Sequence, residues 1–484
     1  MPVHHIAVVH PTSEYKWVRP LAPFIVVLPN QQASKRLQDL SESVYTPSHL
    51  ASKMEIPVQV HCRMLALALV MCGPISASSL ATVDIDAARK SVIDGEKAFD
   101  EKRFDDGAKA YAAAMDTGIQ CPDIAYNAAQ AYSRAGDPKS AFKYLRMAID
   151  LGFHGDLSGD ADLQPLHVQP LWTELIKRHE RKEKAYRAAH SNPDNVHIST
   201  SDVSNFWHAY DLAVTRPPAE WQDIFRQEYF NKRSPGLEDY FVTKIRSEAD
   251  FVRTLQRLPR FYAGVRDDSL AVAGNLPEIK KSFRRLKTLY PQAILPDVYF
   301  VVGELTSGGT STSTGLLLGS EMMSVGPRTF LDELGPWERS AVGPSSSVPG
   351  LVAHEIIHFE QLPSGDNRLL AAALTEGAAD FMGAMISGKL LNDLQSTYGD
   401  SHEAELWRSF SQEMNGTDLS HWLYQGDRHP PGVPADLGYY VGRKICEAYY
   451  ERAKDKKRAI RELVQMRDAT KILQRSGYAE RFSR

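Results

Sequence analysis

The feature that most constrains this chain is a pair of histidines four residues apart, in the stretch Val-Ala-His-Glu-Ile-Ile-His-Phe-Glu-Gln at residues 352–361. Residues four apart lie on one face of a helix, so His354 and His358 can reach the same metal ion while Glu355 projects beside them. The apolar residues of the stretch fall on the roughly opposite face. The pattern predicts a helix that packs on one side and lines a metal site on the other, although such pairs also occur by chance on core helices.

A catalytic zinc ion needs three protein ligands and an open position for water. The predicted third ligand is Glu376, in an Ala-rich stretch at residues 374–382 that contains no proline and is therefore expected to form a second helix. Asp380 follows four residues later on the same face, where its carboxylate can accept the outer N–H of a metal-bound histidine. A solvated acidic face is the alternative for both carboxylates.

A third helix is predicted at residues 435–450, whose apolar stripe leaves Tyr439 and Gly442 on a different face. A hydrolytic site needs a donor for the charge that develops on the substrate oxygen, and Tyr439 is the candidate. A packing role is the alternative for this tyrosine.

These motifs resemble the gluzincin branch of zinc peptidases, in which the third ligand is a glutamate on the next helix. Tyr439-x-x-Gly442 is similar to a motif of gluzincin aminopeptidases, whose tyrosine stabilises the tetrahedral intermediate. Residues 200–207, 289–303 and 307–310 look like a bacterial family of predicted zinc-dependent proteases of unknown substrate. The resemblance covers residues 195–484 and implies a zincin-like domain with Zn²⁺, but no substrate. Gluzincin aminopeptidases also have a motif that recognises the free amine of the substrate, upstream of the helix with the two histidines. This chain has no counterpart of that motif.

The expected activity is therefore a zinc-dependent peptidase acting on a peptide or protein. Zinc held by His354, His358 and Glu376 would polarise a water molecule and the scissile carbonyl. Glu355 would act as general base, and Tyr439 would stabilise the oxyanion. Two alternatives stay open: a zinc hydrolase of a non-peptide amide or ester, and a repeat-based binding protein with a structural metal.

The beginning of the chain predicts export. Residues 54–81 have the pattern of a secretory signal peptide, because Arg63 precedes a short apolar run at residues 64–72 and small residues follow it. That run is too short to span a bilayer, so we expect a periplasmic or secreted protein with no stable membrane span. A short buried helix in a cytosolic protein is the alternative. Residues 1–53 would then be an unassigned extension that is possibly never translated.

No lipid anchor is predicted, although the sequence Leu-Val-Met-Cys at residues 69–72 faintly resembles a lipoprotein box. Met71 is too large for the position before Cys72. The four cysteines of the chain show no C-x-x-C spacing, so they predict neither a zinc cluster nor a disulfide framework. A net charge of −4 gives no electrostatic reason to bind nucleic acid.

Residues 86–190 are expected to form a separate helical domain with an internal repeat. Small and aromatic residues recur after 33 positions, so that Ala98-Phe99 matches Ala131-Tyr132 and Tyr111 matches Tyr144. This period resembles a pair of tetratricopeptide repeats, with a third, degenerate hairpin through residues 171–175. Such surfaces commonly bind a protein partner, and a purely structural role is the alternative.

The remaining domain, residues 195–484, is expected to be α+β and predominantly helical. Strands are predicted at 298–302 and 315–319, joined into a hairpin by a Gly/Ser/Thr loop at 306–314. An edge strand there can pair with an extended substrate backbone. Longer amphipathic helices are predicted at 205–229, 239–258 and 277–287. Surface or packing roles are expected for His402, His421 and His429, with His421 or His429 as a possible aid to Tyr439.

Overall fold

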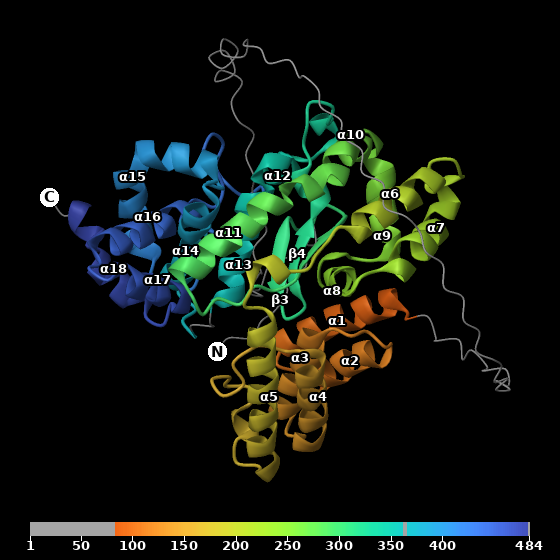
Figure 1. Cartoon of the computed structure of the whole chain (residues 1–484), viewed down its shortest axis with the longest axis horizontal. Helices are drawn as coiled ribbons and strands as arrows, with labels where there is room; N and C mark the ends of the chain where they lie inside the picture. The colour runs from red at the N-terminus through yellow and green to blue at the C-terminus, as the bar shows by residue number, and fades with distance from the viewer. Residues whose placement is uncertain (1–82, 362–364, 483–484) are drawn as a thin grey trace, which may run out of the picture. The chain divides into compact units, whose positions relative to one another are not determined.

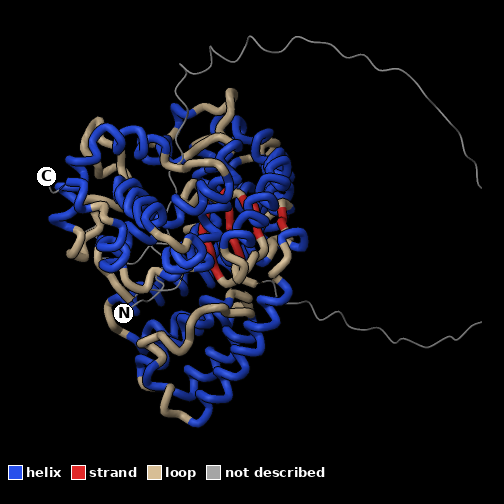
Figure 2. Tube along the Cα trace, turned by 60° about the vertical axis from the view of Figure 1, so that its left-hand side comes forward, coloured by secondary structure: helices blue, strands red, loops and turns tan. Residues whose placement is uncertain are grey.

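The structure, a computed structural model, describes residues 83–361 and 365–482. Helices predominate in these residues, and four short strands form one mixed sheet (Figure 1, Figure 2). The predicted fold class, α+β and predominantly helical, is confirmed at this level. The predicted signal peptide at 54–81 and the extension at 1–53 lie outside the described residues.

Helices at the start of the described chain pack as two hairpins. A Cβ added to Gly95 on the first helix would lie 2.9 Å from the ring of Tyr111 on the second, so a glycine is needed for this close approach. Gly136, with a left-handed φ of 82°, ends the third helix, and Asp137 caps the fourth with its carboxylate. The predicted repeat of 33 residues corresponds to these two hairpins. Their assignment to tetratricopeptide repeats stays a prediction. The helices are α1 (Ile85–Asp100), α2 (Phe104–Asp116), α3 (Pro122–Ala135) and α4 (Pro138–Leu151).

The predicted third hairpin, through residues 171–175, is wrong. These residues belong to one long helix, α5 (Pro170–Ala189), which follows an irregular segment with a 3-10 turn at Gln164–Leu166. The buried residues of α5 are Trp172 and Leu175. This narrow apolar stripe packs on α4 and, through Trp172, on the ring of His167, so no second helix is needed to bury it.

The helical hairpins are fixed to the rest of the molecule by Arg89 on α1, whose side chain is 1% exposed. Its Nε donates to the carbonyl of Ile245 at 2.8 Å, and its Nη1 donates to the carbonyl of Val242 at 2.7 Å. These carbonyls lie at the C-terminal end of helix α8 (Pro235–Lys244), where backbone acceptors lack intrahelical partners and the helix dipole attracts a cation. The guanidinium therefore acts as a cap supplied by a helix far away in sequence.

Between residues 200 and 298 the described chain forms six α-helices, and two of the predicted helices are broken. Helix 205–229 is interrupted at Pro217 and Pro218, because proline excludes the helical conformation from the residue before it. Helix 239–258 is interrupted where Ser247 accepts from the backbone N–H of Asp250 and starts a new helix. The helices are α6 (Ser201–Ala213), α7 (Trp221–Glu228), α8 (Pro235–Lys244), α9 (Glu248–Arg257), α10 (Pro259–Leu270) and α11 (Leu276–Leu289).

The sheet has the strand order β1-β2-β4-β3 and differs from the predicted hairpin. β2 and β4 are parallel neighbours, whereas β4 pairs antiparallel with β3, which comes from the segment predicted to be a loop. Small polar residues hid this strand, because they lack the alternation of apolar and polar residues that marks one. β3 is an edge strand. The strands are β1 (Ile198–Ser199), β2 (Val298–Val301), β3 (Gly309–Thr312) and β4 (Gly315–Gly319).

The C-terminal part is helical, and α14 packs between α13 and α16. By length and composition α14 is apolar enough to cross a membrane, but most of it is buried in the protein and it carries two buried carboxylates. It is therefore a core helix. The helices are α12 (Pro336–Ala341), α13 (Val348–Glu360), α14 (Leu369–Ser387), α15 (Asp393–Glu413), α16 (Leu437–Arg452), α17 (Lys456–Gln465) and α18 (Ala469–Ser476).

Candidate metal site

Helices α13 and α14 bring the three predicted metal ligands together. His354 and His358 lie one turn apart on α13, and their Nε2 atoms are 2.7 Å apart. Glu376 projects from α14, with its Oε2 atom 3.1 Å from His358 Nε2 and 3.6 Å from His354 Nε2. One donor atom from each residue lies within 4.8 Å of the others. His354 and Glu376 are buried, and His358 is partly exposed.

The outer nitrogen of His354 is held by Asp380, the carboxylate predicted for this position. Nδ1 of His354 is 2.8 Å from Oδ1 of Asp380, and the other oxygen of Asp380 accepts from the side-chain amide of Asn392 at 2.8 Å. A carboxylate accepts hydrogen bonds, so Nδ1 of His354 carries the proton. The lone pair on Nε2 is then directed at the other ligands.

The outer nitrogen of His358 is held by Gln361. Nε2 of Gln361 donates to the carbonyl of Thr375 at 2.8 Å, and its Oε1 lies 2.7 Å from Nδ1 of His358. A backbone carbonyl can only accept, so the amide nitrogen of Gln361 must face Thr375 and its oxygen must accept from His358. Nε2 of His358 therefore also presents a lone pair.

This arrangement fits a divalent cation. Two lone pairs facing one another at 2.7 Å repel each other unless a positive charge lies between them, and a carboxylate adds further negative charge. Two imidazoles with one carboxylate form a donor set that suits zinc.

Tyr424 is a member of the site that the sequence analysis missed. Its hydroxyl donates to Oε1 of Glu376 at 2.6 Å, which leaves Oε2 for the histidines. Tyr424 has a left-handed φ of 57°, and the loop around it is fixed because Gln425 and Asp436 exchange two hydrogen bonds. The loop has neither helical nor strand periodicity, so no pattern in the sequence marks this tyrosine.

Glu355 lies beside the ligands and against the edge strand β3. A Cβ added to Gly309 of β3 would lie 2.5 Å from Oε1 of Glu355, so only glycine leaves room for this side chain. Burial raises the pKa of Glu355 to about 8, and the nearby carboxylate of Glu376 adds to this rise. Oε1 has no hydrogen-bond partner among the described residues.

Tyr439 is buried on α16, with its ring centroid 6.4 Å from that of His354. Its hydroxyl has no hydrogen-bond partner in the described part of the chain. His421 and His429, which were predicted to aid Tyr439, have other contacts. Nδ1 of His421 bonds to Glu413 on the surface, and Nδ1 of His429 bonds to the carbonyl of Val433. The structure therefore brings Tyr439 to the site without either histidine.

Gly442, the glycine of the Tyr-x-x-Gly match, has a packing role. A Cβ added there would lie 1.7 Å from the carbonyl oxygen of Ala373 on α14, and one added to Gly377 would lie 2.1 Å from the backbone of Gly442. On the opposite side of α14, a Cβ added to Gly383 would lie 3.2 Å from the backbone nitrogen of His354. Glycines thus let α14 approach both α13 and α16 closely.

The substitution Gly442→Ala should lower the free energy of unfolding by about 3 kcal/mol or more, because the backbones of α14 and α16 must separate. Alanine is intrinsically the better helix former, so helix propensity predicts a higher free energy of unfolding for this variant, whereas packing predicts a lower one. Gly274→Ala is the control, since a Cβ there meets nothing within 4 Å. Chemical denaturation of both variants checks this, and equal midpoints would disprove the tight crossing.

A family model described as gliding motility protein GldB, of a lipoprotein family, matches residues 192–480, which is more than half of the chain. The matched region contains every residue of the candidate metal site. Neither a search of curated proteins nor a search of solved structures found a match. The zincin-like domain therefore stays a prediction.

The family match corrects the functional predictions. The matching family is described as a motility protein, so the predicted relationship to gluzincin peptidases and the predicted activity as a zinc peptidase or other hydrolase are wrong. The reason is physical. Spacing of histidines and a carboxylate on two helices specifies where ligand atoms converge, which is common to catalytic and non-catalytic metal sites.

The same match supports the predicted export, because lipoproteins are exported. It also indicates a membrane anchor, whereas the sequence analysis predicted no lipid. The cysteine in question, Cys72, lies outside the described residues.

Proposed function

The chain belongs to the family of the gliding motility protein GldB, and from this premise we propose that it is an exported, zinc-binding protein that serves motility by binding a partner. The metal would be held by His354, His358 and Glu376. When bound, the ion supplies positive charge that ties α13 to α14. The observation that carries this proposal is the convergence of two imidazole lone pairs and a carboxylate whose outer atoms are all fixed by neighbours.

The residues around the ligands do the positioning. Asp380 and Gln361 set which nitrogen of each histidine faces inward, and Tyr424 sets which oxygen of Glu376 does so. Because such a site forms only when α13 and α14 are packed, metal binding is coupled to folding. The ion therefore stabilises the wall of a pocket that includes Glu355 and His358.

Purified protein should contain one zinc ion per chain, and His358→Ala or Glu376→Gln should lose most of it, because a tetrahedral site tolerates the loss of a ligand poorly. Asp380→Asn should keep the ligands but weaken zinc affinity by roughly 10- to 100-fold. His421→Ala is the control, since that side chain is exposed and bonded to Glu413. Elemental analysis and competition with a chelator measure these effects, and full zinc content in His358→Ala would rule out the assigned ligands.

We further propose that Cys72 carries the lipid that anchors the exported chain. A fatty-acid probe supplied to cells should label the wild-type protein in the membrane fraction, while Cys72→Ser should be unlabelled. Cys121→Ser is the control, because that cysteine is buried in the folded chain. A full-length chain that begins at Met1 and stays in the cytosol would contradict both the export and the anchor.

A binding role and a catalytic role predict different phenotypes for strains that carry variants of this protein. A strain without the protein should lose surface spreading, and wild-type protein should restore it. Glu355→Gln and Tyr439→Phe should restore spreading as well, because each keeps the shape of its side chain while removing the group a hydrolytic reaction would need. His358→Ala should fail, because it loses the metal. Loss of spreading in Glu355→Gln at normal zinc content and protein level would contradict the non-catalytic role.

A further inference from the structure

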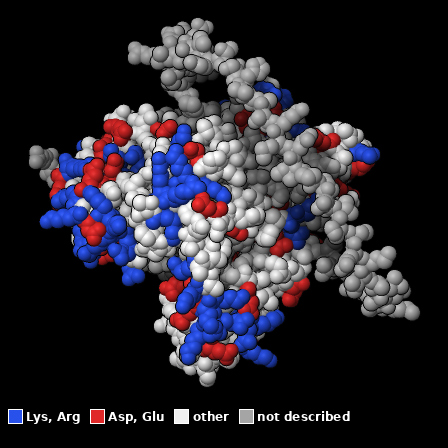
Figure 3. All heavy atoms as spheres, viewed as in Figure 1, with Lys and Arg blue, Asp and Glu red and all other residues white. Residues whose placement is uncertain are grey.

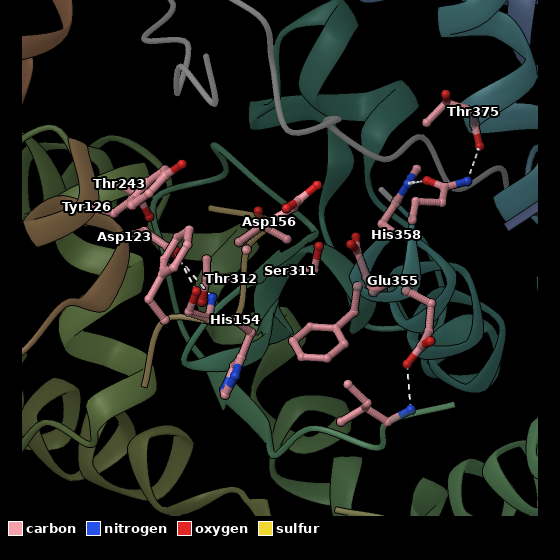
Figure 4. Close-up of a pocket in the computed structure, with 18 of the residues that line it drawn as sticks. Asp123, Tyr126, His154, Asp156, Thr243, Ser311, Thr312, Glu355, His358 and Thr375 are labelled. Atoms are coloured by element: carbon pink, nitrogen blue, oxygen red, sulfur yellow. Dashed lines mark hydrogen bonds between the residues drawn. The ribbon is translucent and has the colours of Figure 1, made fainter. Parts of the chain in front are cut away.

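A cavity of about 380 Å³ lies between the helical hairpins, the edge strand β3 and the metal helix α13. Figure 4 shows Asp123, Tyr126 and His154 on one side of it and Glu355 and His358 on the other, with Ser311 between the two groups. The helical hairpins therefore form one wall of the cavity, and the part of the described chain that follows them forms the opposite wall.

Several buried polar atoms that line this cavity have no hydrogen-bond partner at ordinary geometry among the described residues. They are both carboxylate oxygens of Asp239, which is 1% exposed, and the hydroxyl of Thr310, which is 2% exposed. Buried polar groups are nearly always paired, so orphaned ones that converge on a cavity indicate a ligand or water that completes them.

The wall around Asp239 has an excess of negative charge. Burial, followed by the charge of Asp123, raises the pKa of Asp239 to about 7, against the hydroxyls of Thr312 and Thr314. Asp123 accepts hydrogen bonds from the backbone N–H and hydroxyl of Ser313, at 2.9 and 2.6 Å, which brings it no cation. A cationic ligand would compensate both carboxylates.

The basic residues of the neighbourhood are already engaged or placed elsewhere. Arg187 lines the cavity but is paired with Glu183 at 2.6 Å, and Glu183 also bonds to His154. Lys244 is buried and desolvation lowers its pKa to about 8, and its single charge is shared among Glu355, Glu96 and Asp239, whose attraction opposes that shift. On the face shown in Figure 3, Lys and Arg side chains gather over α11, over the C-terminal helices and at the lower end of the molecule over α4 and α5. Among the described residues no Lys or Arg forms a salt bridge with Asp239 or Asp123, so a cation brought by a ligand can pair with them.

The edge of β3 gives the cavity a second property. Four consecutive residues, 310–313, line it. Side chains of a strand alternate between faces, so a run of consecutive lining residues means that the cavity borders the edge of the strand. β3 pairs with β4 on one side only, and its other edge offers backbone groups to an added strand.

We propose that this cavity binds an extended segment of a partner polypeptide along β3 and holds one of its Lys or Arg side chains against Asp239 and Asp123. The proposal rests on the proposed binding role and names the chemistry of the partner. Main-chain pairing gives affinity without demanding a sequence, while the acidic wall selects a cation. The hydroxyl of Thr310 lies where it can complete the ligand's hydrogen bonds.

The test uses the zinc-loaded full chain and a library of seven-residue peptides, free of proline, in which the central residue is fixed as Lys, Arg, norleucine or Glu. Pools with Lys or Arg should bind about tenfold more tightly than the norleucine pool, because a charge-assisted hydrogen bond is lost in the latter. Equal affinities, tighter binding of Glu or no binding by any pool would overturn the proposal. N-methylated backbones should abolish binding, and unchanged binding would overturn strand pairing.

A matched pair of variants assigns the selectivity to Asp239. Asp239→Asn should bind the Lys and norleucine pools equally, while keeping its zinc and its thermal midpoint, because the carboxylate that would hold the cation becomes a neutral amide of the same shape. Asp202→Asn is the control, since Asp202 is 0% exposed but bonded to Ser234 outside the cavity. Persistent Lys preference in Asp239→Asn would overturn the assignment. Zinc content distinguishes failure of this inference from failure of the proposed function. Wild-type protein with normal zinc but no preference for Lys would refute this inference alone. Wild-type protein without zinc would refute the proposed function.

Discussion

The site depends on the close approach of three helices. α14 lies against α13 on one side and α16 on the other; glycines at the α16 contact let backbones meet where any side chain would collide, and Gly383 lets α14 come close to α13. This packing brings Glu376 to the two histidines and Asp380 to the outer nitrogen of His354. A metal site of this kind is thus a consequence of backbone distance as well as of ligand identity, because ligand atoms must converge within a few ångströms.

Local spacing explains which parts of the site could be predicted. His354 and His358 share a helix, and four-residue spacing fixes their relative position before any tertiary structure is known. Glu376 and Asp380 follow the same rule on a second helix, so that Glu376 reaches the Nε2 atoms of both histidines while Asp380 reaches the outer nitrogen of His354. Tyr424 could not be found this way, since it reaches Glu376 from an irregular loop in a left-handed conformation. Its position is set by tertiary contacts alone.

The wrong predictions have one cause in common, because local sequence patterns do not report tertiary contacts or the role that a site serves. β3 escaped notice because its small polar residues are stabilised by pairing with β4, which no local pattern reports. The glycine of Tyr-x-x-Gly was matched to a catalytic signature, whereas the structure shows it permitting a helix crossing. The peptidase prediction failed at the same level, because convergence of ligands fixes a binding geometry and leaves the role of the ion open.

Arg89 has a consequence for how a partner can enter the cavity. Swinging the helical hairpins away would break both hydrogen bonds from its guanidinium to the carbonyls at the end of α8. These hydrogen bonds oppose a change in the separation of the two walls. If a partner segment pairs with β3 as proposed, the entropy of ordering then falls on that segment, and stiff or tethered stretches of polypeptide are favoured over flexible ones.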